Sequence, residues 1–308
     1  MNLQKSKETK KTLANQKEIT KFLQYLKITR NYTENTVLSY AQELIKYFAY
    51  IEEKKINAYQ ITKEEIRKYL KMLDDKKQKK ATISHNISVV RAYYNYLLRE
   101  EKISQNIWRQ IKNPKLSKKL PNFLTTMEIE TLFSNQDLKS PYDIRNRFII
   151  ELLFATGLRV SELINIKLKD IDRVEKTIRT LGKGKKERIV YYGEYAQELL
   201  DKYLNTSRPL LLNQKQSEYL FVGKNTTQLT RTRISEILEE IVKKVGLKHH
   251  ISPHVLRHTF ATQLLNNGAD IRSVQELLGH ENLSTTQIYT HITNDQLRKS
   301  YRDNMPRK

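Results

Sequence analysis

The chain has 308 residues, of which 38% are hydrophobic and 29% are charged, and this length accommodates two domains of ordinary size. It contains no cysteine, which excludes disulfide bonds, thiolate catalysis and cysteine-ligated zinc or iron. No apolar run approaches the roughly 18 residues of a membrane span, and the first residues lack the apolar stretch of a secretory signal. These features predict a soluble cytoplasmic protein with no membrane partner.

The formal net charge is +22, and the excess is concentrated in the first part of the chain. Residues 1–120 hold 27 of the 56 lysine and arginine residues but only 12 of the 34 acidic residues. A compact chain with this charge repels itself, which favours a polyanionic partner, nucleic acid first. The alternative interpretation is a solvated lysine-rich surface, and charge alone does not decide between the two.

The first part of the chain is predicted to be a helical bundle. After a tail at residues 1–12, apolar residues recur at helical spacing in four segments: 16–28, 34–53, 63–74 and 81–99. Thr62 and Glu65 form a capping box that begins the third segment. Apolar and aromatic residues cover more than one face of the fourth, so we interpret them as core rather than as base-stacking surfaces: Val89, Val90, Tyr93, Tyr94, Tyr96, Leu97 and Leu98. The bundle domain is placed at residues 13–103.

Residues 104–122 contain Pro114 and Pro121 with little apolar periodicity, which is typical of an interdomain linker. The linker is followed by residues 123–308, which are predicted to form a mixed domain dominated by helices. A capping box at Thr125 and Glu128 begins its first helix, which continues to Phe133.

A strongly apolar helix over residues 145–154 ends near Gly157, whose missing Cβ permits a turn before another helix begins near Val160, and Arg159 lies at that junction. Two β-prone runs, 177–181 and 189–192, flank a glycine-containing connection and predict a hairpin. Further helices are predicted at residues 194–204, 231–245, 254–266, 270–278, 284–292 and 294–302. The expected fold class is therefore mainly α with a small β-hairpin or sheet (α+β).

Tyr289, nine residues after His280, is the candidate nucleophile. A phenol has an unperturbed pKa of about 10, so attack on a phosphodiester near neutral pH requires proton removal, neutralisation of the phosphate oxygens and protonation of the leaving oxygen. Arg159 and Arg257 suit the phosphate, because a guanidinium stays charged and binds two oxygens at once. His254 and His280 can donate to a phosphoryl oxygen or exchange a proton. A lysine on the hairpin can protonate the leaving oxygen. This combination predicts DNA strand cleavage.

In order and approximate spacing, four segments resemble the signature regions of the tyrosine recombinase family, specifically its Xer-like bacterial subgroup: residues 155–163, 182–188, 254–262 and 278–291. The resemblance covers both domains. It implies a helical, SAM-like core-binding domain followed by a tyrosine recombinase catalytic domain with a C-terminal tail helix.

The resemblance also implies a role for each candidate residue. Arg159 and Arg257 clamp the scissile phosphate and Lys183 is the general acid. His254 assists proton transfer, His280 supports the phosphate, and Tyr289 attacks it. Glu162 orients the site. The family cuts and rejoins DNA through a 3′-phosphotyrosyl intermediate, without a metal, ATP or another cofactor.

Each residue also has a simpler interpretation when it is considered alone. Arg159 could cap a helix or pair with Glu162, and Tyr289 could be one more core aromatic. His254 and His258 have the spacing of a metal pair, but Val255 stands where a metalloprotease helix carries glutamate. The hairpin lysine has two close alternatives, Lys185 and Lys186. No catalytic role is assigned to the remaining C-terminal histidines, His249, His250 and His291.

The expected partner is double-stranded DNA, around which the two domains of the family close. The resemblance implies a homo- or hetero-tetramer on two DNA sites, with a second recombinase or a DNA translocase as a further possible partner. The C-terminal tail of the chain, residues 294–302, is expected to pack into a neighbouring subunit. A Xer-like resolution of chromosome or plasmid dimers is the favoured role. Three alternatives stay open: integration of a mobile element, a type IB topoisomerase, and a catalytically inert DNA-binding protein.

Overall fold

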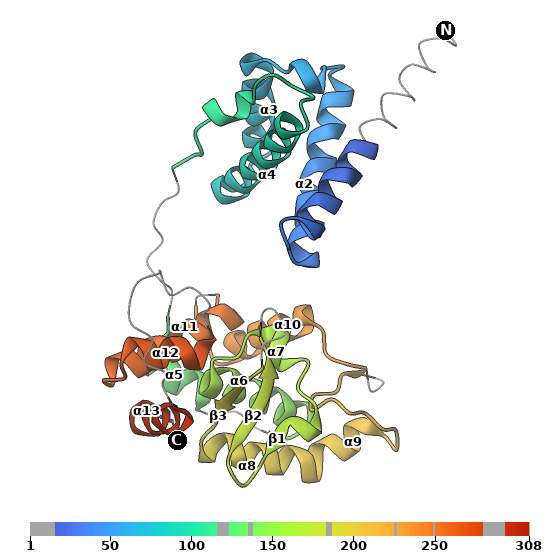
Figure 1. Ribbon diagram of the computed structural model, residues 1–308. Coiled ribbons are helices and arrows are strands. Elements are labelled where there is room, and N and C mark those ends of the chain that lie inside the picture. The colour runs from blue at the N-terminus through green and yellow to red at the C-terminus, as the bar shows by residue number, and fades with distance from the viewer. Residues whose placement is uncertain are drawn as a thin grey trace. The chain divides into compact units, whose positions relative to one another are not determined.

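A computed structural model of the chain describes residues 16–115, 123–134, 138–182, 187–224, 227–248, 250–279 and 293–307. The chain divides into two compact units (Figure 1), residues 1–118 and 119–308. Each unit has its own hydrophobic core. Most described elements are helices and the sheet is small, which confirms the predicted α+β fold class. None of the described helices combines the length and hydropathy that a membrane crossing requires.

The N-terminal unit is a helical bundle, as predicted. Residues 16–28 are helical, and the unit continues with α2 (Glu34–Glu53), η1 (Ala58–Gln60), α3 (Lys63–Asp75), α4 (Lys80–Arg99) and η2 (Ile107–Gln110). The capping box that begins α3 is present: the Thr62 hydroxyl accepts from the Glu65 amide, and the Glu65 carboxylate accepts from the Thr62 amide at 2.7 Å. Apolar spacing and this cap were sufficient to locate the four long helices of the unit, whereas the short helices η1 and η2 were not predicted.

The aromatic residues of α4 lie in the core, which confirms the interpretation that they pack rather than stack on bases. Tyr93 and Tyr94 are each 1% exposed. The hydroxyl of Tyr94 lies 2.8 Å from that of Tyr47 and donates to the carbonyl of Ala58 at 2.7 Å. Trp108 packs edge-on against the Tyr47 ring. The hydroxyl groups of Tyr47 and Tyr94 are therefore satisfied inside the unit.

Part of the predicted linker belongs to this bundle. Trp108 is completely buried and Ile111 is nearly so. Arg91 of α4 donates to the carbonyls of both residues, at 3.1 and 2.6 Å. The segment 104–111 is therefore packed, because its single tryptophan fills the bundle core. A buried stretch of this length is too short to show a helical period, which is why the sequence placed it in the linker.

The C-terminal unit is mixed, with helices on a three-stranded antiparallel sheet of order β1-β2-β3. Its helices are α5 (Thr126–Phe133), α6 (Pro141–Thr156), α7 (Val160–Leu163), η3 (Leu168–Asp170), α8 (Glu194–Lys202), η5 (Tyr203–Ser207), α9 (Arg208–Leu212), α10 (Arg231–Lys244), α11 (Pro253–Asn266), α12 (Ile271–Leu278) and α13 (Asn294–Asn304). Its strands are β1 (Ile171–Asp172), β2 (Thr177–Leu181) and β3 (Glu187–Tyr191).

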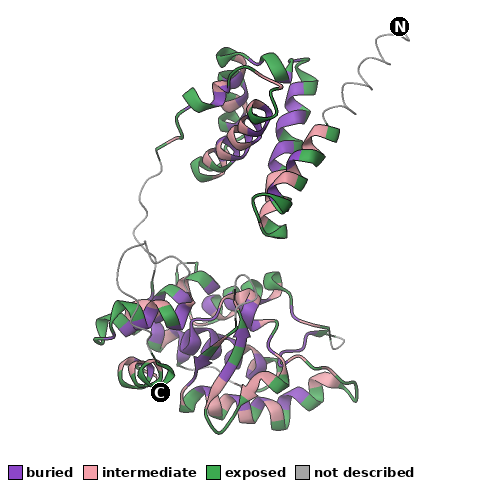
Figure 2. Ribbon diagram, in the orientation of Figure 1, coloured by how far each residue is buried: buried purple, intermediate pink, exposed green. Residues whose placement is uncertain are grey.

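The predicted hairpin is present as β2 and β3, with Ile178 opposite Val190. The strand β1 and the helix α9 were not predicted, because each is too short for a periodic signal. The helix predicted at residues 284–292 lies outside the described residues. Helix α6 is the centre of the unit and is buried along nearly its whole length (Figure 2). Its C-terminal end therefore fixes the turn that carries Arg159.

The tail helix α13 packs on its own unit, beside α11 and α12 (Figure 1). Tyr301 and Met305 belong to the core of that unit. After the helix, the guanidinium of Arg307 donates to both carboxylate oxygens of Glu151, each at 3.1 Å. The buried residues of the tail are thus covered by their own unit, and the packing of the tail into a neighbouring subunit stays a prediction.

Replacing Arg307 by alanine is expected to destabilise the C-terminal unit. Glu151 is 1% exposed and, among the residues that the structure describes, would keep only Arg147, at 3.4 Å, as its ionic partner. Removing one partner of a buried ion pair costs about 3 kcal/mol, which corresponds to a fall in melting temperature of about 5–10 °C. Differential scanning calorimetry of the full chain measures this shift.

The matched control is Arg302→Ala, because Arg302 lies on α13 but is exposed and pairs only with Asp303 at 3.5 Å. Its cost should stay within about 0.5 kcal/mol. Equal melting temperatures for the two variants would show that the contact between Arg307 and Glu151 does not hold the tail.

Candidate active site

A left-handed turn at Gly157 joins α6 to α7 and carries Arg159. Gly157 has a φ of 61° and caps α6 by donating its amide to the carbonyl of Leu153. A Cβ at this position would lie 2.5 Å from Cδ1 of Phe260, so the turn requires glycine for its backbone angle and for its packing. The predicted turn at Gly157 is thereby confirmed, and it places Arg159 at the N-cap of α7.

Glu162 is a buried carboxylate that accepts four N–H groups. Arg159 donates its backbone amide and its Nη1, both at 2.8 Å. Arg188 of β3 donates Nη1 and Nη2 to the two carboxylate oxygens, at 2.9 and 2.8 Å. Each oxygen thus accepts twice, which uses the full hydrogen-bonding capacity of the group.

Burial alone would raise the pKa of Glu162, but the hydrogen bonds and charge of Arg188, followed by those of Arg159, hold it below its usual value. Glu162 is therefore ionised. The pairing of Arg159 with Glu162, which the sequence left open as the simpler interpretation, is present. Glu162 accepts from Nη1 alone of the guanidinium, while Nη2 of Arg159 donates to the carbonyl of Gly279 at 3.3 Å. The side chain is 32% exposed.

Arg257 of α11 reaches the same place from a different helix. Its Nη1 donates to the carbonyl of Gly157 and its Nη2 to the carbonyl of Leu278, at 2.5 and 2.6 Å. Burial and the charge of nearby Arg159 lower the pKa of Arg257 to about 10, so it remains protonated at neutral pH. The structure therefore brings Arg159 and Arg257 together at the end of α12, from segments about a hundred residues apart.

His254 lies in the first turn of α11, on the same helix face as Arg257. It is exposed and lines a cavity of ≈ 380 Å³. The other residues around this cavity include Arg257, His258, Leu265, Ile271 and Leu278. Among the residues that the structure describes, no third histidine or carboxylate joins His254 and His258 as a possible metal ligand. His254, which can carry a proton, and Arg257, which has a fixed charge, thus line the same cavity.

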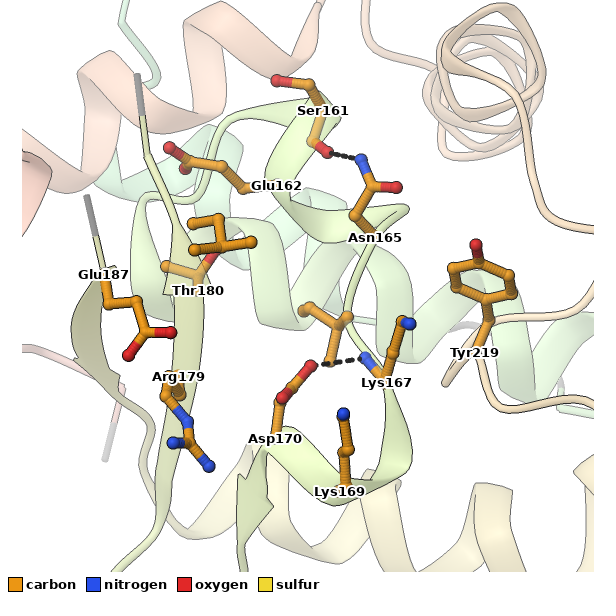
Figure 3. Close-up of a pocket in the computed structure, with 12 residues that line it drawn as sticks. Ser161, Glu162, Asn165, Lys167, Lys169, Asp170, Arg179, Thr180, Glu187 and Tyr219 are labelled. Carbon is orange, nitrogen blue, oxygen red and sulfur yellow. Dashed lines mark hydrogen bonds between the residues drawn. The ribbon is translucent and has the colours of Figure 1, made fainter. Parts of the chain in front are cut away.

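Lys183, His280 and Tyr289 lie outside the described residues, as do Lys185, Lys186, His249 and His291, so their proposed roles stay predictions. The chain on either side of residues 183–186 is described: Leu181 pairs with Glu187 at the end of the hairpin next to its connection. Both residues line a second cavity of ≈ 550 Å³ that Glu162 also borders. Figure 3 shows Glu162, Thr180 and Glu187 gathered on one side of it, opposite Lys167 and Tyr219. The hairpin that carries Lys183 therefore begins beside Glu162.

Comparison with known proteins assigns the chain to a family. The model of the phage integrase family matches residues 122–296, and that of the phage integrase N-terminal SAM-like domain matches residues 19–101. The tyrosine recombinase XerC of Bacillus licheniformis is 41% identical over 94% of this chain and 96% of that protein, and XerC of Bacillus subtilis is 41% identical over 93% and 95%. The chain belongs to the phage integrase family.

Solved structures of phage integrase relatives agree with this assignment. The XerH site-specific recombinase, bound to a palindromic difH substrate in a post-cleavage complex, has a TM-score of 0.67 and 26% identity over 92% of this chain and 83% of that chain. The Tn1549 transposon integrase in complex with DNA shares the fold, with a TM-score of 0.66 and 20% identity over 92% and 98%. The predicted Xer-like tyrosine recombinase, a DNA strand-exchange enzyme with a SAM-like first domain, is confirmed.

One residue of this phage integrase site was missed from the sequence. Arg188 lies in the segment 182–188 that carries the family resemblance, but only the lysines of that segment were considered. A usable signal was present, because residues two apart on a strand share a face and Val190 is a core position. Strand parity therefore points Arg188 inward, where a charged side chain requires a partner.

Proposed function

We propose that the chain cleaves DNA by attack of Tyr289 on a scissile phosphate held by Arg159 and Arg257. One observation carries this proposal: the two guanidinium groups converge on the backbone of residues 278–279, immediately before His280 in the sequence. The bond between the Tyr289 oxygen and phosphorus forms while the bond from phosphorus to the 5′ oxygen breaks. Lys183 gives a proton to that leaving oxygen, and His254 assists removal of the phenolic proton. Rejoining reverses these steps.

The charges of the described site suit the transition state of phosphodiester cleavage. Arg159, Arg188 and Arg257 supply three positive charges and Glu162 supplies one negative charge, which leaves two in excess. A phosphodiester carries one negative charge and gains more on its equatorial oxygens as the nucleophile adds. Fixed cations stabilise that added charge most strongly in a site from which water is partly excluded.

We infer that the partner is double-stranded DNA and that the enzyme acts as a tetramer on two DNA sites, either alone or with a second recombinase or a DNA translocase. The excess of lysine and arginine in residues 1–120 supplies phosphate contacts. The similarity to XerC proteins favours resolution of chromosome or plasmid dimers in the cytoplasm, with roles in chromosome partition and cell division. The transposon integrase shares only the fold, so integration of a mobile element is the weaker alternative.

A nicked suicide duplex tests the proposal, once genomic fragments that the protein binds have been mapped to supply the site. The wild-type protein is expected to form a covalent adduct that survives denaturing electrophoresis, whereas Tyr289→Phe should bind the same duplex and form none. The matched control is Tyr142→Phe, which removes the hydroxyl of an exposed tyrosine and should leave the adduct unchanged.

The other functions have distinct outcomes in this assay. Binding without an adduct by the wild-type protein would identify an inert DNA-binding protein. An adduct accompanied by relaxation of supercoils but no recombinant junctions would identify a type IB topoisomerase. An adduct that persists in Tyr289→Phe would assign the attack to another residue.

A further inference from the structure

Arg188 connects the hairpin to the arginine clamp. It is the second residue of β3, and its side chain is 13% exposed. Its two terminal nitrogens bind the two oxygens of Glu162 in the parallel fork geometry that is the strongest form of this pair. The same carboxylate holds Arg159. A displacement of Arg188 would therefore move Glu162 and, through this shared carboxylate, Arg159.

Arg188 also lies against the residue that precedes His280. A Cβ at Gly279 would meet Nη1, Cδ and Cζ of Arg188 at 3.0, 3.1 and 3.2 Å. Gly279 is left-handed, with a φ of 65°, and its carbonyl accepts from Arg159. One side chain thus contacts the carboxylate that orients Arg159 and the glycine at the end of α12.

We propose that Arg188 is a positioning residue for strand cleavage: by holding Glu162 it limits the bonds from Arg159 to that carboxylate to Nη1 and the backbone amide, so that the exposed part of the Arg159 guanidinium can face the scissile phosphate. This inference rests on the proposed function of Arg159. A carboxylate and a guanidinium prefer to pair through two parallel bonds. Arg188 already takes that mode with Glu162, so Arg159 is limited to Nη1 and its backbone amide.

Removing Arg188 has a defined structural consequence. Glu162, which is buried, would lose two of its four donors. The best replacement is the remaining edge of Arg159, whose rotation into a two-bond pair would withdraw it from the phosphate. Misplacement of a catalytic group by about 1 Å can reduce a rate by about 100-fold without a change in binding. Arg188 therefore affects the rate of cleavage rather than the affinity for DNA.

Single-turnover cleavage of the suicide duplex at saturating DNA, together with a separate measurement of Kd, tests this role. Arg188→Ala is expected to cleave about 100-fold more slowly, with Kd within about threefold of wild type. Arg188→Lys keeps the charge but lacks the fork, so it should be slowed by about tenfold. The control Arg173→Ala removes an exposed arginine that pairs with Asp201 and should cleave at the wild-type rate.

Melting temperatures of the variants show whether each one is folded. A variant that is folded and saturated with DNA but still cleaves slowly supports a positioning role rather than a merely structural one. If Arg188→Ala fails to fold, Arg188→Lys carries the test. Cleavage by Arg188→Lys within about threefold of wild type, or a loss explained by weaker DNA binding, would overturn the inference. A wild-type protein that forms no adduct would instead overturn the proposed function.

Discussion

Lysine in place of Arg257 is expected to reduce the rate of covalent adduct formation by about 10²–10³-fold, the usual loss when one fixed donor to a developing oxyanion is removed. Arg257 is 9% exposed, and its two terminal nitrogens contact carbonyls of two segments, at Gly157 and Leu278. A lysine ammonium supplies a point charge without this planar fork, so it cannot hold both segments and a phosphate in one arrangement.

Single-turnover adduct formation measures this loss, and a gel mobility shift gives the accompanying Kd, which should change little because most affinity comes from other phosphate contacts. The matched control is Arg233→Lys on α10, a half-buried arginine whose partners are Glu236 and Glu240. Comparable rates for the two variants would remove Arg257 from the phosphate clamp.

Alanine at Gly157 is expected to cost about 3 kcal/mol of stability. A left-handed backbone costs a residue with a Cβ about 1 kcal/mol, and forcing an atom into a packed core costs about 2 kcal/mol more. The added atom would lie 2.5 Å from Cδ1 of Phe260 and 3.0 Å from Cδ2 of Leu278. Both side chains are buried, and the melting temperature of the unit should fall by about 10 °C.

A control variant separates the backbone cost of Gly157→Ala from its packing cost. Gly246 is also left-handed, with a φ of 77°, but a Cβ there would have no neighbour within 4 Å. Gly246→Ala should therefore show only the backbone cost of about 1 kcal/mol. Equal shifts by calorimetry would mean that packing at the Gly157 turn is looser than the structure shows. Of these two variants, only Gly157→Ala is expected to cleave DNA more slowly, because the carbonyl of residue 157 accepts a hydrogen bond from Arg257.

Elements with a local signal were predictable from the sequence. The helices α2, α3 and α4 have regular apolar spacing, and a capping box marks the start of α3. In contrast, β1 has two residues, and the burial of Trp108 depends on helices that lie earlier in the chain. Spacing does not report such distant packing.

The same distinction applies to the site. Arg159, Glu162 and Arg257 could be named from short motifs, and they do come together. The contacts that align them could not be foreseen, because they depend on carbonyls such as those of Gly157 and Gly279, whose position is set by tertiary packing. Arg188 was missed for a different reason, since the hairpin was inspected for a proton donor and not for an inward-facing partner of Glu162.

The docking of α13 on its own unit limits how the tail could be exchanged between subunits. Thr293 caps α13, and Tyr191 holds the next residue by donating to the carbonyl of Asn294 at 3.1 Å. Tyr301 and Met305 lie in the core of the same unit. Moving the tail onto a neighbouring subunit would first expose these two side chains to water, which opposes the exchange.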